Sequence, residues 1–507
     1  MIRIFSLLIL IVLIYNCKPK STSETYQPPL PSNLTGKELA QTYCGSCHLY
    51  PEPSLLDSLT WAQGVLPKML ARLGLEQDSF KLFASLDFEE IHTIANSGIY
   101  PDHPQIANED WAKIVKFYLE NSPKIPSPQD EKPTIKNHLT GFRIKQLTAD
   151  KNKIPSVTLV KFDSPNKKII IGYRGSSNFL KKYDLDFNQT DSIPLPSPIA
   201  DIYHSKLLCM GQMDPNDKKK GGLLIENSKK SLIDSLQRPV NMAWGDLNGD
   251  KIEDYVICQF GNELGKVSWF DGKTNKENKL NELPGARNAS IKDINNDGLL
   301  DITVLMTQAK EQILTYINIG SISNPRFEEK SILKFPPVYG SSYFELVDFN
   351  QDGYQDILYT NGDNADLSIV LKKYHGIRIF LNDGKGYFTQ TYFYPMHGAS
   401  KAMAADFDLD GDLDIAAISF FTDPKQVPNE GFLLLSNEGD NTSFSVSTFE
   451  AAKTGKWLVM DIADMDSDGD NDIILGSFKL KMTREINPTL KRQIEVIILE
   501  NKKISSN

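Results

Sequence analysis

Two segments near the N-terminal end place apolar residues with the period of an α-helix. In residues 34–43, LTGKELAQTY, Leu39 and Tyr43 lie four positions apart, and Thr35 can cap the start. In residues 108–123, NEDWAKIVKFYLENSP, Asn108 can cap the start and Pro123 ends the pattern. The shared apolar face of this second segment consists of Trp111, Ile114, Val115, Tyr118 and Leu119. The pattern predicts two amphipathic helices.

The pattern changes after residue 123. The stretch NSPKIPSPQDEKPTIKN is rich in proline and charge, and no apolar period continues through it. This composition predicts a semi-rigid linker over residues 124–136. From residue 137 onward the chain consists of short β-type runs separated by turn signals, which predicts a β-rich remainder.

The β-rich part repeats a nine-residue segment five times. The copies are DLNGDKIED (246–254), DINNDGLLD (293–301), DFNQDGYQD (348–356), DFDLDGDLD (406–414) and DMDSDGDND (464–472). Each copy carries oxygen-bearing side chains at positions 1, 3, 5 and 9, and a β-type run such as ITVLM or IAAISF follows at once. Five matches at similar spacing indicate a repeated structural unit.

The oxygen-bearing positions of these loops predict calcium sites. Ca²⁺ prefers six to eight oxygen ligands, and alternate residues of a tight loop point the same way. The predicted ligands are Asp246, Asn248, Asp250, Asp254, Asp293, Asn295, Asp297, Asp301, Asp348, Asn350, Asp352, Asp356, Asp406, Asp408, Asp410, Asp414, Asp464, Asp466, Asp468 and Asp472. Up to five ions are expected, and solvated acidic turns are the alternative.

Two details refine the calcium prediction. Position 6 is glycine in four loops, but the first loop has Lys251 there and departs most from the pattern. An EF-hand would need glutamate at position 12, where these loops have Ile257, Val304, Tyr359, Ala417 and Leu475. The five segments also carry more net negative charge than the whole chain, whose formal net charge is −10. The acidity therefore belongs to the loops, and it argues against nucleic acid as a partner.

The stretch TYCGSCHLY contains the spacing for covalent haem attachment. Cys44 and Cys47 can take the two vinyl groups of one haem, and His48 can bind the haem iron. A structural zinc site would need a second close pair of ligands, and no such pair follows. The other cysteines of the β-rich part, Cys209 and Cys258, lie in strand-like runs and are expected to be buried thiols.

Met69 is the predicted sixth ligand of the haem iron. It is the only methionine between His48 and the second predicted helix. A methionine ligand favours ferrous iron and raises the reduction potential, which suits electron transfer. The alternative is that Met69 belongs to a helical core stripe, with His92 or His103 as the substitute ligand.

The N-terminal residues predict export. Residues 1–16 combine Arg3 with a short apolar run and read as a signal peptide. The run before Cys17 resembles a lipobox, although Asn16 is bulkier than usual, so Cys17 is the expected lipidation site. Residues 17–33 then form a tether to a bacterial membrane, and the protein is expected to be periplasmic or at the cell surface. Plain secretion without lipid is the alternative.

Two family resemblances follow from these motifs. The helix leading into CGSCH and the aromatic-rich helix that follows resemble a class I cytochrome c domain over residues 34–123. The acidic loops, with the turn RIFLNDGKGYF (378–388), resemble the FG-GAP/VCBS calcium-loop repeat of β-propellers over residues 137–503. Two earlier runs, at 157–175 and 199–227, give two more blades without an acidic loop. We therefore expect seven blades, with six or eight as alternatives, and closure by FRIKQLT (142–148) beside IEVIILE (494–500).

The resulting fold class is multidomain: a small all-α cytochrome c domain followed by an all-β propeller. The resemblances imply one covalent haem c and an exported electron-transfer lipoprotein whose propeller docks a redox partner protein or a carbohydrate. One alternative is a propeller dehydrogenase that oxidises a sugar or alcohol, with His375 or His397 as base and the haem as electron acceptor. Another is an adhesion or scaffold protein.

Overall fold

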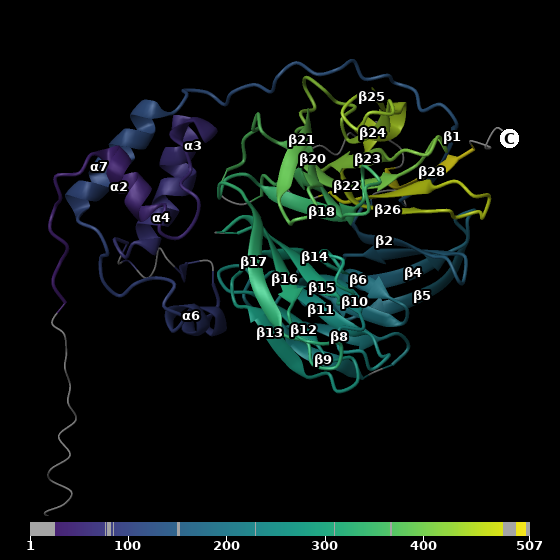
Figure 1. Ribbon diagram of the computed structural model, residues 1–507, viewed down its shortest axis with the longest axis horizontal. Coiled ribbons are helices and arrows are strands. Elements are labelled where there is room, and N and C mark those ends of the chain that lie inside the picture. Colours follow the sequence, from purple (N-terminus) through teal and green to yellow (C-terminus); the bar gives the residue numbers. More distant parts are fainter. Residues whose placement is uncertain are drawn as a thin grey trace, which may run out of the picture.

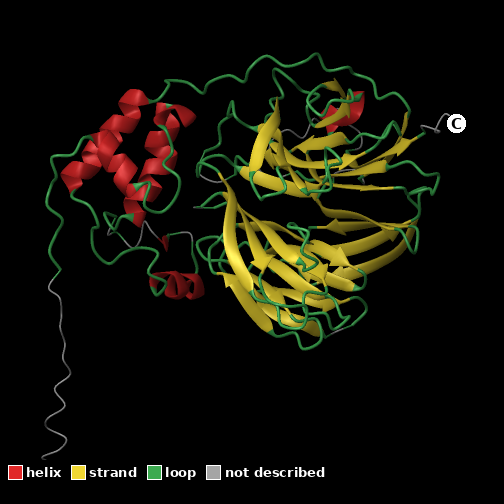
Figure 2. Ribbon diagram, in the orientation of Figure 1, coloured by secondary structure: helices red, strands yellow, loops and turns green. Residues whose placement is uncertain are grey.

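Seven four-stranded antiparallel sheets surround a common axis in the computed structural model of the chain (Figure 1, Figure 2). The structure describes residues 26–502 except 77, 79–82, 85, 150–152, 229, 309, 366–367 and 480–492. The predicted signal peptide and Cys17 lie outside the described residues. The expectation of a seven-bladed propeller is confirmed.

Each blade is a meander of consecutive strands. Blade 1 contains β2 (Val157–Asp163), β3 (Lys168–Tyr173), β4 (Asn178–Tyr183) and β5 (Gln189–Leu195), and blade 2 contains β6 (Ile199–Tyr203), β7 (Lys206–Cys209), β8 (Gly221–Ile225) and β9 (Ser231–Leu236). Blade 3 contains β10 (Pro239–Gly245), β11 (Asp254–Gln259), β12 (Lys266–Phe270) and β13 (Glu277–Asn281). Blade 4 contains β14 (Ala286–Lys292), β15 (Asp301–Met306), β16 (Gln312–Asn318) and β17 (Phe327–Lys334).

The next two blades repeat the arrangement. Blade 5 contains β18 (Ser341–Val347), β19 (Asp356–Asn361), β20 (Gly376–Asn382) and β21 (Phe388–Pro395). Blade 6 contains β22 (Ala399–Ala405), β23 (Asp414–Ser419), β24 (Phe432–Asn437) and β25 (Phe444–Ser447), followed by a short 3-10 helix, η3 (Glu450–Thr454). The first strands of neighbouring blades contact one another around the axis.

Blade 7 is built from both ends of the β-rich part. Its strands are β26 (Trp457–Ala463), β27 (Asp472–Ser477), β28 (Ile494–Asn501) and β1 (Phe142–Thr148), in the sheet order β1-β28-β27-β26. Strand β1 pairs antiparallel with β28, and Phe142 lies opposite Asn501. The predicted closure is therefore confirmed. It joins the two ends of the β-rich part into one ring of blades, in which the short outer strand of each blade keeps one free edge.

Each nine-residue acidic repeat joins the first and second strands of one of blades 3 to 7. Position 9 of the repeat is the first residue of the second strand, as with Asp254 in β11 and Asp472 in β27. These five second strands are buried at every position. Both faces of such a strand pack against neighbouring blades, which explains why the β-type runs after the repeats are continuously apolar.

The alternation of strand direction separates the loops onto two faces. Loops between first and second strands, which include the five acidic repeats, lie on the face that we call the acidic-loop face. Loops between second and third strands, and those between blades, lie on the opposite face. The helical segment contacts only loops of this opposite face in the contacts described below.

The N-terminal part, residues 34–123, forms short helices around one small core. They are α2 (Gly36–Tyr43), η1 (Pro53–Leu55), α3 (Ser58–Thr60), a π-helical turn η2 (Trp61–Val65), α4 (Leu66–Arg72), α6 (Phe88–Ala95) and α7 (Asn108–Asn121). Thr35 caps α2 in a capping box with Glu38, as predicted. Asn108, the expected cap of α7, is instead its first residue, and Ala107 takes the cap position.

The expectation of a multidomain chain with a separate all-α cytochrome c domain is wrong. The core of the helical segment includes Trp61, Ile114 and Tyr118. Val338, from the loop between blades 4 and 5, and Val370, from the β19–β20 loop, pack against this core. These helices, between three and fourteen residues long, do not cover their apolar surface alone. The chain is therefore a propeller with a helical segment packed on one face, as Figure 2 shows.

Polar contacts also attach the helical segment to the propeller. Glu90 of α6 is buried, and its Oε1 accepts the backbone N–H of Asp217 at 2.9 Å. Lys218 forms ion pairs with Asp87 and Glu90, and Arg72 pairs with Glu263. Among the described residues, no helix has the length and apolar character needed to cross a membrane.

Candidate functional site

The CGSCH residues lie at the C-terminal end of α2. Cys44 is the C-cap residue, and its backbone N–H donates to Ala40 O at 2.9 Å. Cys44 is half-buried, Cys47 is exposed, and both are free thiols. Burial raises the pKa of the Cys44 thiol to about 11, so the thiol is protonated at neutral pH. Both sulfurs are therefore free for covalent attachment to haem.

The imidazole of His48 is oriented by the backbone. Its Nδ1 lies 2.9 Å from Leu49 O, a distance that suits donation from a protonated Nδ1. Burial lowers the pKa of His48. A neutral ring with the proton on Nδ1 leaves the lone pair on Nε2, which is the arrangement that an iron ligand needs.

Met69 and Cys44 lie against the same apolar core. Both pack on the cluster that contains Trp61 and Tyr118. The two alternative ligands have other environments: His92 is exposed and lies near Asn96 of its own helix, and the ring of His103 stacks on Tyr26 with centroids 4.3 Å apart. Of the three candidates, Met69 is the one grouped with Cys44 in this core. Met69 lies in α4 and packs on this core together with Leu73, which is also what the alternative of a helical core stripe predicts. The thiols of Cys44 and Cys47 and the imidazole of His48 fit covalent haem attachment, and Met69 as the sixth ligand stays a prediction.

Close packing of α2 on α7 fixes the position of the motif. A Cβ atom at Gly36 would lie 2.3 Å from Lys113 O and 2.8 Å from Phe117 Cβ, so only glycine fits at this crossing. Tyr118 of α7 donates from its hydroxyl to Pro51 O at 2.8 Å, just after the motif. Helix α2 therefore fixes the chain just before residues 44–48, and the hydrogen bond from Tyr118 of α7 fixes it just after them.

The five acidic loops share one backbone arrangement. In each loop the carboxylate at position 1 accepts the backbone N–H groups of positions 5 and 6; in the second loop Asp293 accepts from Asp297 and Gly298 at 3.1 and 2.7 Å. The same pair of contacts recurs at Asp246, Asp348, Asp406 and Asp464. Position 1 thus folds the loop in addition to being a predicted ligand.

Position 9 has a role that the sequence pattern did not indicate. Asp356 accepts the N–H of Phe349 on one oxygen and that of Asn382, at the end of the third strand, on the other. Equivalent pairs of amides bind Asp254, Asp301, Asp414 and Asp472. All five carboxylates are buried. These carboxylates connect the loop to the third strand, in addition to their predicted role as calcium ligands.

Position 3 distinguishes the second and third loops from the fourth and fifth, whereas Asn248 of the first loop donates to Asp271 at 3.2 Å. In the second and third loops, Asn295 and Asn350 donate to the position-5 carboxylates Asp297 and Asp352 at 2.8 and 2.9 Å. These pairs close the loop without an ion. In the fourth and fifth loops position 3 is aspartate, and ligand oxygens of Asp406, Asp408 and Asp414, and of Asp464, Asp466 and Asp468, lie within 4.8 Å of one another.

Position 7 contributes two carboxylates that were not among the predicted ligands. Asp412 and Asp470 each have a buried Oδ1 without a hydrogen-bond partner, as does Asp466. Burial and the neighbouring carboxylate of Asp468 raise the pKa of Asp470 to about 7. Buried unpaired oxygens next to other carboxylates are what a bound cation would satisfy, so the fourth and fifth loops fit Ca²⁺ best. The run Asp-Gly-Asp in these two repeats is the signal for this position.

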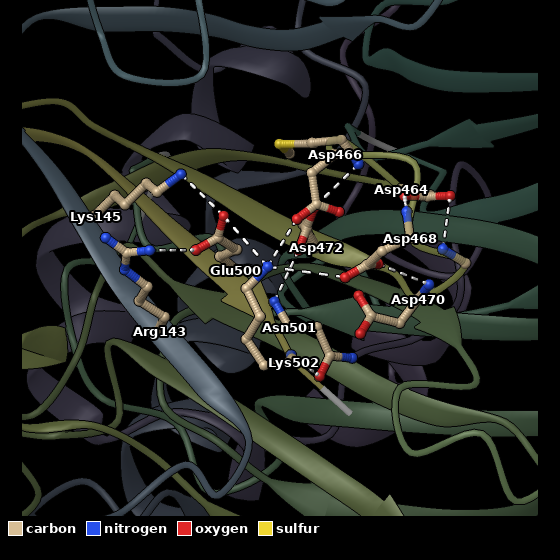
Figure 3. A network of polar contacts seen from close by, with 12 residues as sticks. Arg143, Lys145, Asp464, Asp466, Asp468, Asp470, Asp472, Glu500, Asn501 and Lys502 are labelled. Carbon is tan, nitrogen blue, oxygen red and sulfur yellow. Dashed lines mark hydrogen bonds and ion pairs between the residues drawn. The ribbon is translucent and has the colours of Figure 1, made fainter. Parts of the chain in front are cut away.

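A lysine lies against the fifth loop. Lys502 Nζ is 2.8 Å from Asp466 Oδ2, 3.8 Å from Asp468 Oδ2 and 3.6 Å from Glu500 Oε1 (Figure 3). Glu500 also pairs with Lys145 and Arg143 of β1, at 2.9 and 3.7 Å. The network therefore connects the fifth loop to the pair of strands that closes the ring.

The two candidate bases differ in access. His375 is fully buried, so its ring does not reach a ligand. His397, with 8% of its surface exposed, borders a groove between the linker and the loops of blades 5 and 6. Cys209 and Cys258 are buried free thiols, as predicted.

Known proteins resemble the chain in two respects. Residues 293–359 and 360–417 match the FG-GAP-like repeat. The WD40 domain of Neurospora crassa Pan2 is similar in structure, with 10% identity and a TM-score of 0.44 over 72% of this chain and 98% of that one. A putative 6-phosphogluconolactonase from Bacteroides uniformis has 9% identity and a TM-score of 0.37 over 57% and 82% of the two chains. At this level of similarity, neither neighbour informs function.

Proposed function

We propose that this propeller with FG-GAP-like repeats is an exported electron carrier with one covalently bound haem c. Cys44 and Cys47 would attach the haem, and His48 and Met69 would ligate its iron. The proposal rests on one observation above all: two free thiols and an imidazole oriented by Leu49 O lie together beside the core that Met69 joins. The haem is held in the helical segment of the propeller and not in a separate domain.

The haem supplies one-electron chemistry, and the chain supplies its position and exposure. Cys47 is exposed, so the attachment site lies at the surface, where a partner protein can approach. On its inner side the motif packs through Cys44 against the core that contains Trp61 and Tyr118, and this packing excludes water from the inner side of the haem site. Such asymmetric burial suits electron exchange through an exposed edge.

The fourth and fifth acidic loops are the proposed calcium sites. Their unpaired carboxylate oxygens support binding there, and the closed Asn–Asp pairs argue for weaker binding at the second and third loops. Calcium would neutralise crowded carboxylates on the acidic-loop face, opposite the helical segment. The ion is thus proposed as a structural support for the disc that carries the haem.

The propeller would dock a redox partner protein or a carbohydrate, and the lipid on Cys17 would hold the protein at a bacterial membrane. The location follows from the predicted signal peptide and lipobox alone. The polar residues 17–33 provide a tether between the lipid and α2.

Visible spectroscopy tests the proposed electron carrier. The protein is expressed together with haem-maturation machinery, and spectra are recorded before and after dithionite. A c-type α-band that appears on reduction is expected, and it should be lost when Cys44 and Cys47 are both replaced by Ala. Replacing the buried thiols Cys209 and Cys258 by Ala is the matched control and should leave the band. The absence of any haem band in the wild-type protein would refute the proposal.

A dehydrogenase is the second candidate function. The observation that favours it is the groove that His397 borders, because a substrate bound there would lie beside the linker to the helical segment. Haem reduction by a sugar or alcohol without dithionite would identify this activity.

A further inference from the structure

A groove of about 370 Å³ separates the proline-rich linker from the loops of blades 5 and 6. One wall is the linker itself, from Pro126 to Lys132. The other wall consists of Val370 and Leu371 from the β19–β20 loop, His397 from the β21–β22 loop, and Asp423, Gln426 and Val427 from the β23–β24 loop. Its volume is within the range of small-molecule sites.

Buried polar atoms without partners gather at this groove. The Oε1 of Gln129 and the Nδ1 of His397 are both buried and have no hydrogen-bond partner. Both residues line the groove. Because buried polar groups are nearly always hydrogen-bonded, such a cluster points to a bound polar molecule.

The charges around the groove exclude anionic ligands. Lys132 forms an ion pair with the buried carboxylate of Glu430, which offsets its charge. Burial, reinforced by the charge of Lys132, lowers the pKa of His397 to about 4, so its ring is neutral at physiological pH. Asp423, which is 5% exposed, adds a negative charge to the lining. A phosphate or carboxylate would find no uncompensated cation among the lining residues.

We propose that this groove binds a neutral carbohydrate of one or two sugar rings. Sugar hydroxyls both donate and accept, so they can pair with Gln129 Oε1 and with either tautomer of His397. The carboxylate of Asp423 accepts from hydroxyls, and the walls formed by Val370, Leu371 and Val427 cover the C–H face of a ring. This inference deepens the carbohydrate-docking part of the proposed function and rests on it.

The groove lies next to the helical segment. Pro126, Ser127, Val370 and Leu371 also line a smaller cavity, whose other side is formed by Ser54 to Asp57 of the helical segment. The groove is thus on the face of the propeller that carries the proposed haem. A bound sugar would lie beside the segment that holds the electron acceptor.

Isothermal titration calorimetry tests the proposal on the full-length, haem-loaded protein. The probes are glucose, maltose and cellobiose, with glucuronate as an anionic comparison. At least one neutral sugar should bind, and glucuronate should bind at least tenfold more weakly than glucose. Leu371→Trp, which fills the groove, and Asp423→Asn should each weaken neutral-sugar binding at least tenfold.

The control variant is Ile319→Trp, which adds the same bulk at an exposed site on the acidic-loop face. It should bind the sugars as the wild type does, and melting curves confirm that each variant is folded. The inference is overturned if none of the sugars binds, if glucuronate binds as tightly as glucose, or if folded Leu371→Trp retains full binding. The visible spectrum of the same sample reports on the haem separately, so a failure of the groove is distinguishable from a failure of the electron carrier.

Discussion

Lys502 Nζ lies 2.8 Å from Asp466 Oδ2, so an amine contacts the loop that is proposed to bind calcium (Figure 3). The side chain of Lys502 is 44% exposed and that of Asp466 is 23% exposed. An ion pair this close to solvent contributes little to stability by itself. We expect Lys502 instead to weaken calcium binding, because its positive charge repels the calcium ion.

Replacing Lys502 by Gln should tighten calcium binding at the fifth loop. The lysine ammonium repels a calcium ion that is a few ångströms away. For partly exposed groups, the loss of this repulsion should raise the affinity for calcium about fivefold. Calorimetric titration of calcium-free protein measures the change. Lys330→Gln, which removes an exposed lysine of β17 that pairs with Glu328, is the control. Unchanged affinity in Lys502→Gln would contradict the prediction.

Removing calcium should lower the melting temperature. A ligand present at 100 times its dissociation constant stabilises the folded state by about 2.7 kcal/mol for each site. Melting curves in EGTA and in calcium should therefore differ clearly for the wild type, and by about half as much for Asp470→Asn, which alters only the fifth loop. Equal curves, with no calcium found by elemental analysis, would rule out the calcium sites.

Replacing Asp356 by Asn should destabilise blade 5. The carboxylate accepts from Phe349 N and Asn382 N, and an amide would direct N–H donors at one of these N–H groups. Leaving a buried donor unpaired costs about 1–3 kcal/mol. Urea unfolding measures the loss, and Asp234→Asn, at an exposed position of β9, should change stability little. An Asp356→Asn protein as stable as the wild type would show that these bonds do not hold the loop.

Without calcium, stability should fall as the pH rises from 5 to 8. Burial raises the pKa of Asp414 to about 7, and burial with a nearby carboxylate does the same for Asp470. Groups with raised folded-state pKa values stabilise the fold at low pH, and this contribution is lost as the pH passes through about 7. Melting temperatures in EGTA across this range test the effect. A melting temperature that increases with pH would contradict it, and calcium should reduce the dependence.

Replacing Met69 by Leu should remove the sixth ligand without removing the haem. The reduced α-band should remain, whereas the weak far-red ferric band that marks methionine ligation should disappear and the reduction potential should fall. Met403→Leu in the propeller is the matched control. If the ferric band persists in Met69→Leu, another residue is the ligand, and His92→Gln and His103→Gln would identify it.

Much of the propeller could be predicted because its signals are local. The acidic repeat and the apolar run after it lie within one hairpin, so their spacing along the chain gives the blade period. The closure of β1 on β28 could be predicted because both were left without partners once seven blades had been counted.

The features that could not be predicted depend on contacts between residues far apart in the sequence. Nothing in the helical pattern of residues 34–123 indicates that Val338 and Val370 complete its core, so a separate domain was expected. The structural role of position 9 was missed because its amide partner at the third strand, such as Asn501 for Asp472, lies far along the chain; its role as a calcium ligand stays a prediction. His375 looked accessible in a glycine-containing loop but is buried by the segments around it.

The pairing of β1 with β28 also sets the time at which the protein can finish folding. Strand β1 is synthesised before every other described strand of the ring, yet its partner, Ile494–Asn501, follows all of them in the chain. Until then Phe142–Thr148 presents an unpaired strand edge, which is a template for aggregation. Until residues 494–501 have been made, the blades therefore form an open chain, and only the pairing of this last strand with β1 closes the ring.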